Sequence, residues 1–564
     1  MLILNKKRLS RKITLALCIV FTMSMFAGCA SKTPVKEETK TEETKPAEEV
    51  KVVEEQSIIY NVGAEPDSID PTLLTTVGGM TIANQVFEGL MRLDENNSPV
   101  VATAEKVDFD AATPTKYVFH IRKDAKWSDG QPLTAKDFEY SWKRVLDPKV
   151  ASDYANQLYY LKNGQAFNGG KAKVEDVGVK ATDDYTLEVE LEVATPYFLQ
   201  LCALSTLMPV RKDIVEKDPE KWTLDPATYI GNGPFKLTSW THDASMEYVK
   251  NDNYWNKAEV KLDKMKFVMI VQSTSALAAF ETGEVDYLDE LPANDIPKLV
   301  ADKKAISVPY IGTYYLSLNN KVKGLDNAKV RKALALAIDR PLLIEAVWKD
   351  PRKPATAWVP YGISDSDATK EFRTVGGDFY DGKGDIAQAK KLLAEAGYPD
   401  GKGFPEMEYA YNKSETHAKI AQAVQDMWKK NLGINVKLSE VDWKVFVPQR
   451  KVGDYQISRD GWIGDYMDPV TFMDIMVSTD GNNHPQYKNL KYDELILGAK
   501  KEVDPAKRMT MIHDAEKILM EDMPMIPIAF YVSNVACKTY VKGVRKIPTG
   551  MMYFDRAFVE GKTK

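Results

Sequence analysis

The stretch that decides the fold class is residues 416–438, THAKIAQAVQDMWKKNLGINVKL. It predicts a helix from about Thr416 to Leu432 that ends at Gly433, because glycine accepts the backbone conformation that closes a helix. Ile434, Val436 and Leu438 then alternate with polar residues, which is the period of a half-buried strand. A helix that passes directly into a strand indicates an α/β fold.

Other segments show the same two periods. Two strands are predicted from alternating apolar residues, one at Tyr117, Phe119 and Ile121 and the other at Leu187, Val189 and Leu191. One further helix is expected from about Asn327 through Ala346, with Val330, Leu334 and Ile338 on one stripe. Another is capped by Asp385 and stopped by Gly397, with Ile386, Ala389 and Leu393 facing inward. No repeat of about 20 to 50 residues emerges, which argues against a solenoid.

The 564 residues exceed what one hydrophobic core supports, so two or more lobes are expected. The composition is globular, and the 27 Tyr and 10 Trp suit broad recognition surfaces. The formal net charge is −6, and removal of the five basic residues of the leader described next takes it to −11. This balance argues against nucleic acid or an anionic lipid surface as a partner.

The N-terminus is typical of an exported protein. Basic residues at 6–12 precede an apolar run from Ile13 to Phe26, which is too short to span a membrane. Residues 1–28 are therefore predicted to be a cleaved signal peptide. Ala27-Gly28-Cys29 resembles a bacterial lipobox, in which the cysteine becomes the first residue and carries diacylglycerol and an N-acyl chain such as palmitate. An ordinary signal peptide that contains a cysteine is the alternative.

Residues 29–55 are expected to form a disordered tether behind acylated Cys29. Paired glutamates alternate with single lysines, and such a composition buries too little apolar area to offset the cost of ordering. A helix is the alternative for a Glu/Lys-rich stretch, but the apolar positions follow no helical period and Pro34 and Pro46 interrupt it. We therefore expect an extracytoplasmic protein anchored to the membrane by its lipid.

Signatures of enzymes and metal sites are thin. The five histidines include no i, i+4 pair, and no G-x-S-x-G motif occurs. Gly377 to Lys383 spells G-x-x-x-x-G-K but is followed by Gly384 rather than a hydroxyl residue, so we interpret it as a glycine-rich loop. The acids between 365 and 385 are too irregular for a calcium loop and are expected to cap loops. Cys202 and Cys537 could pair, but without a close-spaced framework we expect free, buried thiols.

The chemically informative block is residues 459–469, RDGWIGDYMDP. Its glycines let a ligand approach the backbone closely, and Trp462 and Tyr466 flank Asp465 with apolar surface. Desolvation there would strengthen pairing of the carboxylate with a cation such as an ammonium. The alternative is that Asp465 or Asp468 caps the helix that begins near Pro469, and for Asp468 this is the better interpretation.

This block resembles a loop of the oligopeptide-binding proteins, the family 5 solute receptors of bacterial ABC importers. The resemblance covers nearly the whole body of the chain, with motifs in the family's order. They are FEGL at 87–90, AKWSDG at 125–130, TAKDF at 134–138, YSW at 140–142, NGPFKL at 232–237, VRKAL at 330–334 and the segment 387–397. The resemblance implies the two-lobed periplasmic-binding-protein-like α/β fold (type II, cluster C), with a two-stranded hinge and an inserted lobe.

The resemblance also implies domain boundaries. Lobe I would comprise residues 56–87, 211–311 and 532–564, the inserted lobe II residues 88–210, and lobe III residues 312–531. The two cysteines would then lie in different lobes, too far apart for a bridge.

The resemblance also implies which residues of this chain stand at the ligand-binding positions of the family. Asp465 matches the acid that pairs with the peptide α-amino group, and Tyr154 matches a tyrosine that contacts this acid. Trp462 and Gly461 match a strip that presents backbone groups to an extended peptide. Val77, Tyr310, Tyr315 and Trp443 match contact and pocket positions, whereas Arg459, Arg450 and His417 match basic groups that meet ligand carboxylates. For His417 alone, a helix-surface histidine is the alternative.

The chain also departs from some members of the family. Gly312 and Ile463 stand where enteric members carry a disulfide, and Thr75 stands at the position of an acidic contact. The resemblance nevertheless implies a monomeric receptor that binds oligopeptides and delivers them to permease subunits, with no cofactor, no metal and no catalysis. Receptors for dipeptides, murein peptides, pheromones or a nickel chelate share the fold. A surface peptidase or peptide chaperone is the alternative from another class.

Overall fold

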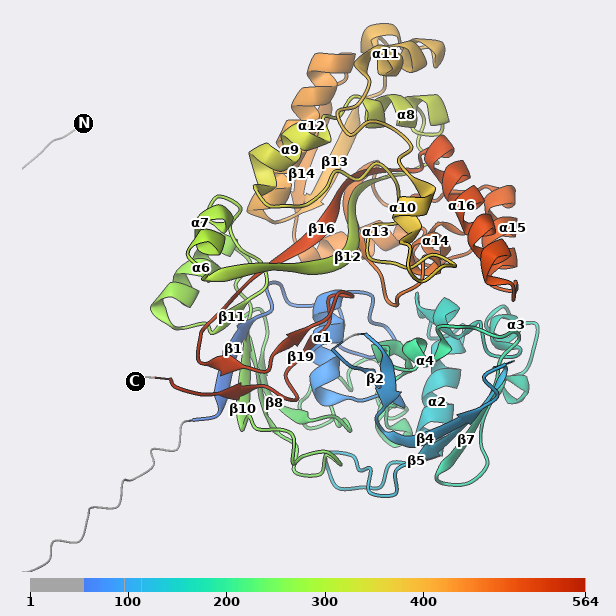
Figure 1. Ribbon diagram of the computed structural model, residues 1–564, viewed down its shortest axis with the longest axis vertical. Coiled ribbons are helices and arrows are strands. Elements are labelled where there is room, and N and C mark those ends of the chain that lie inside the picture. The colour runs from blue at the N-terminus through green and yellow to red at the C-terminus, as the bar shows by residue number, and fades with distance from the viewer. Residues whose placement is uncertain (1–54, 96, 113, 563–564) are drawn as a thin grey trace, which may run out of the picture. The chain divides into compact units, whose positions relative to one another are not determined.

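The computed structural model describes residues 55–95, 97–112 and 114–562 (Figure 1). The predicted signal peptide, Cys29 and the tether up to residue 54 lie outside the described residues. Within the described part of the chain, no helix combines the length and the apolar character needed to cross a membrane.

A ten-stranded mixed sheet organises the body of the chain. Its strands follow the order β14 (Val436–Val441), β13 (Met407–Asn412), β15 (Ile457–Ile463), β12 (Ala305–Leu318), β16 (Met525–Cys537), β11 (Tyr287–Leu288), β1 (Ser57–Asn61), β10 (Lys264–Val268), β9 (Ser245–Lys250) and β8 (Phe235–Thr241). The long antiparallel pair β12 and β16 runs through both halves of this sheet, as Figure 1 shows. The register of this pair is interrupted between Pro309 and Thr313 of β12, opposite Val532 and Phe530 of β16.

The two halves of the sheet are the frames of two lobes. We call the half with β13, β14 and β15 the β13 lobe. Its helices are α8 (Ala328–Leu336), α9 (Arg340–Leu343), η4 (Ile344–Trp348), α10 (Phe372–Gly376), α11 (Ile386–Glu395), η5 (Pro399–Gly401), α12 (Glu415–Leu432), α13 (Trp443–Val452), α14 (Val470–Met473), η6 (Asp474–Met476), α15 (Leu490–Ala499) and α16 (Pro505–Asp522). We call the half with β1 and β8–β11 the β1 lobe. Its helices are α1 (Val77–Val86), α6 (Ser273–Thr282) and α7 (Ile296–Ala301).

A separate four-stranded antiparallel sheet forms the frame of what we call the small-sheet lobe. Its order is β4 (Ala104–Phe109), β5 (Lys116–Ile121), β7 (Thr186–Glu190) and β6 (Val179–Ala181). Helix α2 (Ala135–Leu146) packs on β6 and β7, and Trp142 of α2 is fully buried. The shorter helices of this region are η1 (Ala155–Leu158), α3 (Gly164–Asn168), η2 (Val174–Asp176), α4 (Phe198–Leu201), η3 (Ser205–Leu207) and α5 (Lys212–Val215). The two strands predicted in this region are confirmed, although Leu191 lies one residue beyond β7.

Three two-stranded ladders complete the described strands. They are β2 (Met91–Leu93) with β3 (Pro99–Val101), β17 (Val541–Lys542) with β20 (Phe558–Val559), and β18 (Arg545–Lys546) with β19 (Met552–Tyr553).

The unit predicted at residues 416–438 is confirmed. Ser414 caps α12 by accepting a hydrogen bond from the backbone N–H of His417, and Gly433 ends the helix with a φ of +70°. Strand β14 follows and pairs in parallel with β13, which precedes the helix. The segment therefore forms a β-α-β unit.

Two helix predictions need correction. The helix expected through Ala346 stops at Leu336, because Pro341 lacks a backbone donor and a new helix, α9, begins behind the Asp339 cap. In α11, capped by Asp385 as predicted, Ala389 and Leu393 are buried but Ile386 is 44% exposed. Ile386 is the first residue of the helix.

The predictions on loops are confirmed, and both thiols are free as expected, although Cys537 is less buried than predicted. Gly377 to Lys383 forms an irregular loop, and Asp365, Asp367 and Asp381 bind backbone N–H groups close to them in the chain. Cys202 is buried and Cys537 half-buried, and both are free thiols. No group of His, Cys, Asp and Glu side chains among the described residues is arranged to hold a metal ion.

Candidate ligand-binding cleft

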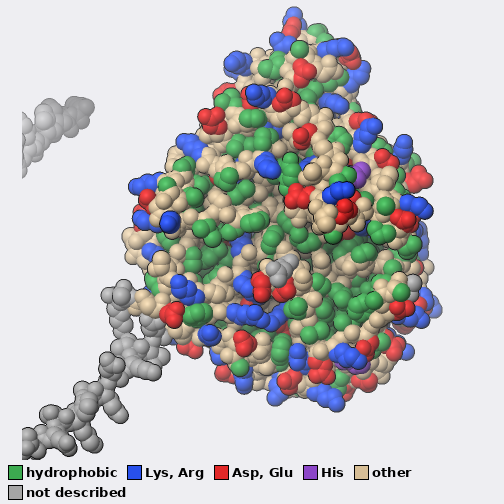
Figure 2. All heavy atoms as spheres, viewed as in Figure 1, with side chains coloured by type: hydrophobic (Ala, Val, Ile, Leu, Met, Phe, Trp, Pro, Cys, Tyr) green, Lys and Arg blue, Asp and Glu red, His purple; other side chains and the backbone are tan. Residues whose placement is uncertain are grey.

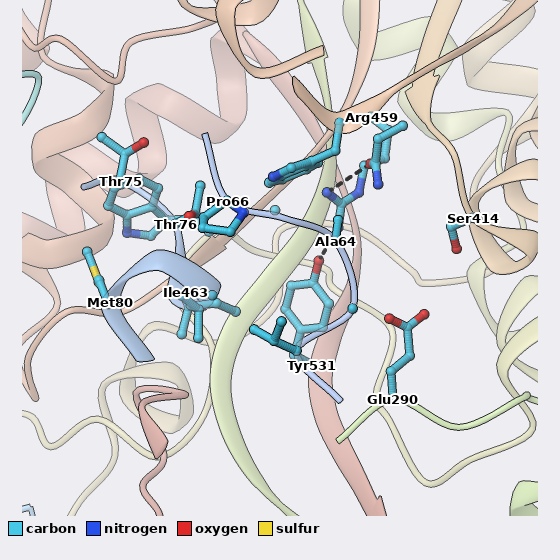
Figure 3. Close-up of a pocket in the computed structure, with 18 of the residues that line it drawn as sticks. Ala64, Pro66, Thr75, Thr76, Met80, Glu290, Ser414, Arg459, Ile463 and Tyr531 are labelled. Carbon is cyan, nitrogen blue, oxygen red and sulfur yellow. Dashed lines mark hydrogen bonds between the residues drawn. The ribbon is translucent and has the colours of Figure 1, made fainter. Parts of the chain in front are cut away.

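A cavity lies where the β13 lobe meets the β1 and small-sheet lobes. It consists of two connected hollows of about 350 Å³ and about 310 Å³. Eight residues line both hollows, namely Val62, Val77, Gly78, Glu290, Tyr310, His417, Arg459 and Tyr531. Figure 3 shows the first hollow, in which Thr76 at the start of α1 and Ile463 of β15 lie on one side and Glu290 and Ser414 on the other. On the face drawn in Figure 2, hydrophobic side chains gather in the band where the lobes meet.

Asp465 sits at the first hollow and is only 7% exposed. It follows the end of β15, and its backbone N–H donates to Thr471 Oγ1 over 2.9 Å. Tyr154 Oη donates to one carboxylate oxygen over 3.2 Å and Gln157 Nε2 to the other over 3.5 Å. Among the described residues no lysine, arginine or histidine forms an ion pair with Asp465. The cavity wall therefore contains a buried acid without a counter-cation.

Burial raises the pKa of Asp465 to about 7, although the hydrogen bonds from Tyr154 and Thr471 favour the ionised form. A cation entering the cavity would restore the ionised carboxylate and recover the free energy lost to desolvation. Asp468, three residues on, is different. It accepts from the Val470 N–H at the start of α14, although Pro469 holds the N-cap position, and it forms a two-bond ion pair with Arg508.

Trp462 and Tyr154 form an aromatic wall next to Asp465. Their rings are stacked, with centroids 6.3 Å apart and 15° between the planes. The Trp462 indole N–H donates to the Thr471 carbonyl over 2.8 Å, which fixes the ring. At Gly461, a side chain would collide with the hydroxyl of Tyr531, so glycine is needed for this close approach.

Strand β15 has an edge at the cavity that pairs with no described strand, although the Gly461 N–H in this stretch donates to Asp460 Oδ1 over 2.8 Å. On one side it pairs with β12 along its whole length, including Gly312 opposite Ile463. On the other side β13 pairs only with Ile457 and Ser458. From Arg459 to Ile463, the second backbone edge therefore has no strand partner among the described residues. Such an edge can accept an added extended strand.

Arg459 and His417 lie on both hollows. The Arg459 guanidinium stands 5.1 Å from the Tyr314 ring centre and donates to Tyr531 Oη and to Asn412 Oδ1, but it pairs with no described carboxylate. His417 Nδ1 lies 3.3 Å from Tyr314 Oη. Desolvation and the nearby Arg459 hold the pKa of His417 well below its usual value, so this ring is neutral at neutral pH. Arg459 thus offers a free charge, whereas His417 offers only hydrogen bonds.

Arg450 is committed to a different partner. Although it lines the first hollow, its guanidinium pairs with buried Asp460, which also contacts His484 Nδ1 at 2.9 Å. Burial raises the pKa of Asp460, but Arg450 and His484 outweigh it and the pKa falls to about 2. The prediction that Arg450 meets a ligand carboxylate is therefore not favoured, because its charge is already neutralised.

Tyr315 does not reach the cavity. It is fully buried against Trp358 with ring centroids 4.9 Å apart, and it lines neither hollow. Its neighbour Tyr314 takes the cavity side instead, because successive residues of a strand point to opposite faces. The register of β12 against β16 also shifts between these two tyrosines.

The other predicted residues are brought together. Val77 begins α1, Trp443 begins α13 behind the Asp442 cap, and Tyr310 packs against Tyr531 at a centroid distance of 5.6 Å. All three line the first hollow, as does Thr75. The sequence analysis missed Glu290 and Tyr531, which line both hollows. Tyr531 lies within the continuous apolar strand β16, so no pattern distinguishes it from a core residue.

Several contacts close the mouth of the cavity between lobes. Lys444 of α13 pairs with Asp243 over 2.8 Å and Glu65 over 3.2 Å, and Lys451 pairs with Asp153 over 2.9 Å. Tyr466 stacks on Tyr197 of the small-sheet lobe with ring centroids 4.5 Å apart. The structure is therefore a closed form.

The chain belongs to family 5 of the bacterial extracellular solute-binding proteins, whose family model matches residues 98–484. It has the two-lobed periplasmic-binding fold of that family. The chain is 38% identical over 567 aligned residues to the oligopeptide-binding protein OppA of Bacillus subtilis, covering 98% of this chain and 99% of that one. The crystal structure of Haemophilus influenzae OppA in complex with RPPGFSPFR superposes with a TM-score of 0.85 at 32% identity, covering 90% and 99% of the two chains.

A third comparison bears on the closed state. The unliganded open form of the murein tripeptide binding protein MppA is 33% identical and covers 90% of this chain and 98% of its own, yet its TM-score is only 0.60. The sequence identity is similar for the two structures, so the lower TM-score reflects a different arrangement of the lobes. The lobes are open in the MppA structure and closed in this one.

Proposed function

We propose that this chain is the substrate-binding component of an ABC importer and captures oligopeptides in extended form between its lobes. The observation that carries this proposal is the juxtaposition of buried Asp465, which has no counter-cation, with the edge of β15 that pairs with no described strand. The acid takes the peptide α-ammonium group, and the strand edge takes the peptide backbone. Arg459, Tyr154, Trp462, Gly461, Val77, Tyr310 and Trp443 complete the binding site.

The register interruption in β12 and β16 supports the hinge of this proposal. It falls between Pro309 and Thr313 and opposite Val532 and Phe530, which supports a hinge at these residues. We therefore propose that lobe III comprises residues 312–531 and that lobe I ends its second segment at 311 and begins its third at 532. Residues 88–210 form the inserted lobe.

The chain is proposed to be held at the outer face of the cell membrane by acylated Cys29. Cys29→Ala should leave it unlipidated and release it, because the described residues offer no helix that could span a membrane. Recovery of this variant in membrane pellets at wild-type levels would contradict the anchor. From there the monomeric receptor hands its peptide to permease subunits.

Binding and turnover decide between a receptor and an enzyme. Mass spectrometry of peptides that co-purify with the chain should reveal oligopeptides, and calorimetry with tetra-alanine should measure their affinity. Incubation of the same peptides with pure protein should leave them intact. Cleavage of these peptides would instead favour a surface peptidase.

A further inference from the structure

The charged groups of the second hollow are mostly neutralised by one another. Lys546 lies 3.3 Å from Asp289, and Arg352 lies 2.6 Å from Asp350. Tyr60 also donates to Asp289 over 2.9 Å. These groups pair with one another in the wall and need no counter-charge from a ligand.

Two charged residues of this hollow lack such a partner, the cation Arg459 described above and the acid Glu290. Glu290 follows β11, reaches solvent and lines both hollows, and desolvation by the surrounding protein raises its pKa. Among the described residues, no side chain forms a hydrogen bond or ion pair with its carboxylate. Figure 3 shows the Glu290 side chain extending toward the Ser414 side of the cavity. An acid placed in a binding cavity without a partner is free to contact what enters.

The charged groups near Glu290 include few cations that are free to pair with it. They are the acids Asp289 and Glu415 and the cations Arg459 and Lys546. Lys546 is already shared with Asp289, and Glu415 is bound to Ser273 and Thr274 hydroxyls from the other lobe. Lys413, the other cation of the wall that lacks a described carboxylate partner, is not among these charges. Once a peptide carboxylate occupies Arg459, Glu290 faces acids and no free cation.

The hollow around Glu290 also suits a long alkyl side chain. Tyr60, Tyr310, Tyr314, Trp348 and Tyr531 line it. Aromatic surface accepts the methylene stem of lysine or arginine, and aromatic faces attract their cationic heads. Glu290 can then pair with the head of that side chain.

We propose that Glu290 is a specificity-determining residue that selects peptides with a lysine or arginine side chain directed into the second hollow. This inference rests on the proposed peptide-binding function and adds a preference that an extended backbone alone would not provide. It predicts a ligand that carries one more positive charge than a simple zwitterionic peptide.

The test uses alanine tetrapeptides with one lysine at position 2, 3 or 4, and the matching glutamine peptides. In the wild-type protein, one lysine peptide should bind about tenfold more tightly than its glutamine counterpart, or about 1.4 kcal/mol. Acetylation of that lysine should abolish the gain without any change to the protein. In Glu290→Gln the lysine and glutamine peptides should bind equally.

Glu259→Gln is the matched control, because Glu259 is an exposed acid of the β1 lobe that does not line the cavity. It should retain the tenfold preference. Lysine and glutamine peptides that bind wild type within twofold at every position would overturn the inference and leave peptide binding intact. A preference that persists in Glu290→Gln would overturn it as well. If no tetrapeptide binds wild type, the proposed function itself fails, and the inference with it.

Discussion

Tyr154 and Asp465 are 311 positions apart in the chain, yet Tyr154 Oη donates to Asp465 Oδ1 across 3.2 Å at the closed cavity. One residue comes from the small-sheet lobe and the other from the β13 lobe. Their contact can form only when these lobes come together. The acid that is proposed to bind the ligand is thus oriented by the same closure that encloses the ligand.

Asp465→Asn should weaken peptides with a free amino group by two to four decades. Loss of the acid leaves an enclosed ammonium unpaired, which commonly costs about 3–5 kcal/mol. The empty variant should unfold at the same temperature or a higher one, because a buried acid without a counter-cation is removed. Calorimetry gives the affinities and thermal melting the stability.

N-acetylated peptides are the control for this variant. They lack the ammonium, so they should bind wild type weakly and lose little more in Asp465→Asn. Equal affinity of wild type for free and acetylated peptides would place the amine elsewhere. So would a variant within threefold of wild type for the free peptide.

Peptide binding should release protons below neutral pH. The pKa of Asp465 is about 7 in the closed cavity, and pairing with a peptide ammonium should bring it below that value. Affinity should therefore fall from pH 7 to pH 5, by at most about tenfold per pH unit. Calorimetry in buffers of different ionisation enthalpy counts the protons. The same affinity at pH 5 and pH 7 would contradict this coupling.

The same pKa shift has a defined sign for stability. An acid with a raised pKa in the folded state destabilises it above the ordinary value near ~3.9, fully so above about 7. The empty protein should therefore lose stability between pH 4 and pH 7 through this group. Peptide removes that penalty, so the rise in melting temperature on adding peptide should be larger at pH 7.5 than at pH 5. Asp465→Asn should show no such difference.

Substitution of Arg459 should weaken peptide binding, whereas substitution of Arg450 should lower the stability of the fold. Arg459→Met removes a cation that has no described carboxylate partner, so peptides with a free C-terminus that reaches it should weaken by about 1.5–3 kcal/mol. Peptide amides should be unaffected. Arg450→Met instead strands buried Asp460 and should lower the melting temperature strongly. Equal loss of amidated and free peptides in Arg459→Met would argue against this role.

Local pattern was enough to predict the elements whose ends are chemically marked. Ser414 and Gly433 bound α12, and the strand after it follows from simple alternation. The helix expected from Asn327 was predicted too long because its apolar stripe continues beyond Leu336, where Pro341 forces a new start. An apolar stripe indicates which face of a helix is buried. It does not indicate whether the helix is continuous.

Site residues could be predicted only where they lie close together in one short sequence motif. Asp465 and Trp462 stand in one short block, so their proximity follows from the sequence. Tyr314 and Tyr315 are adjacent, and their spacing alone does not tell which of them faces the cavity, because the register of β12 against β16 shifts between them. Glu290 is one acid after a two-residue strand, and nothing in the sequence marks it. Its importance depends on the ion pair between Asp289 and Lys546, which forms only in the folded chain.

Lys444 and Lys451 should control how long a peptide stays bound. They lie on α13 and pair across the mouth of the cavity, Lys444 with Asp243 and Glu65, Lys451 with Asp153. Both lysines are partly exposed, so each is worth at most about 1 kcal/mol and is weakened by salt. Because these pairs form only on closure, Lys444→Met with Lys451→Met should speed peptide dissociation several-fold and change the association rate little.

Stopped-flow fluorescence with a labelled peptide at low and high salt measures both rates. Wild type should release peptide faster at high salt, whereas the double variant should have lost most of this dependence. Lys501→Met is the matched control, since Lys501 is exposed, forms no described ion pair and lies away from the cavity wall. It should behave as wild type. A double variant that releases peptide at the wild-type rate and keeps its salt dependence would show that closure is held by packing, such as the stack of Tyr466 on Tyr197, rather than by the charges of α13.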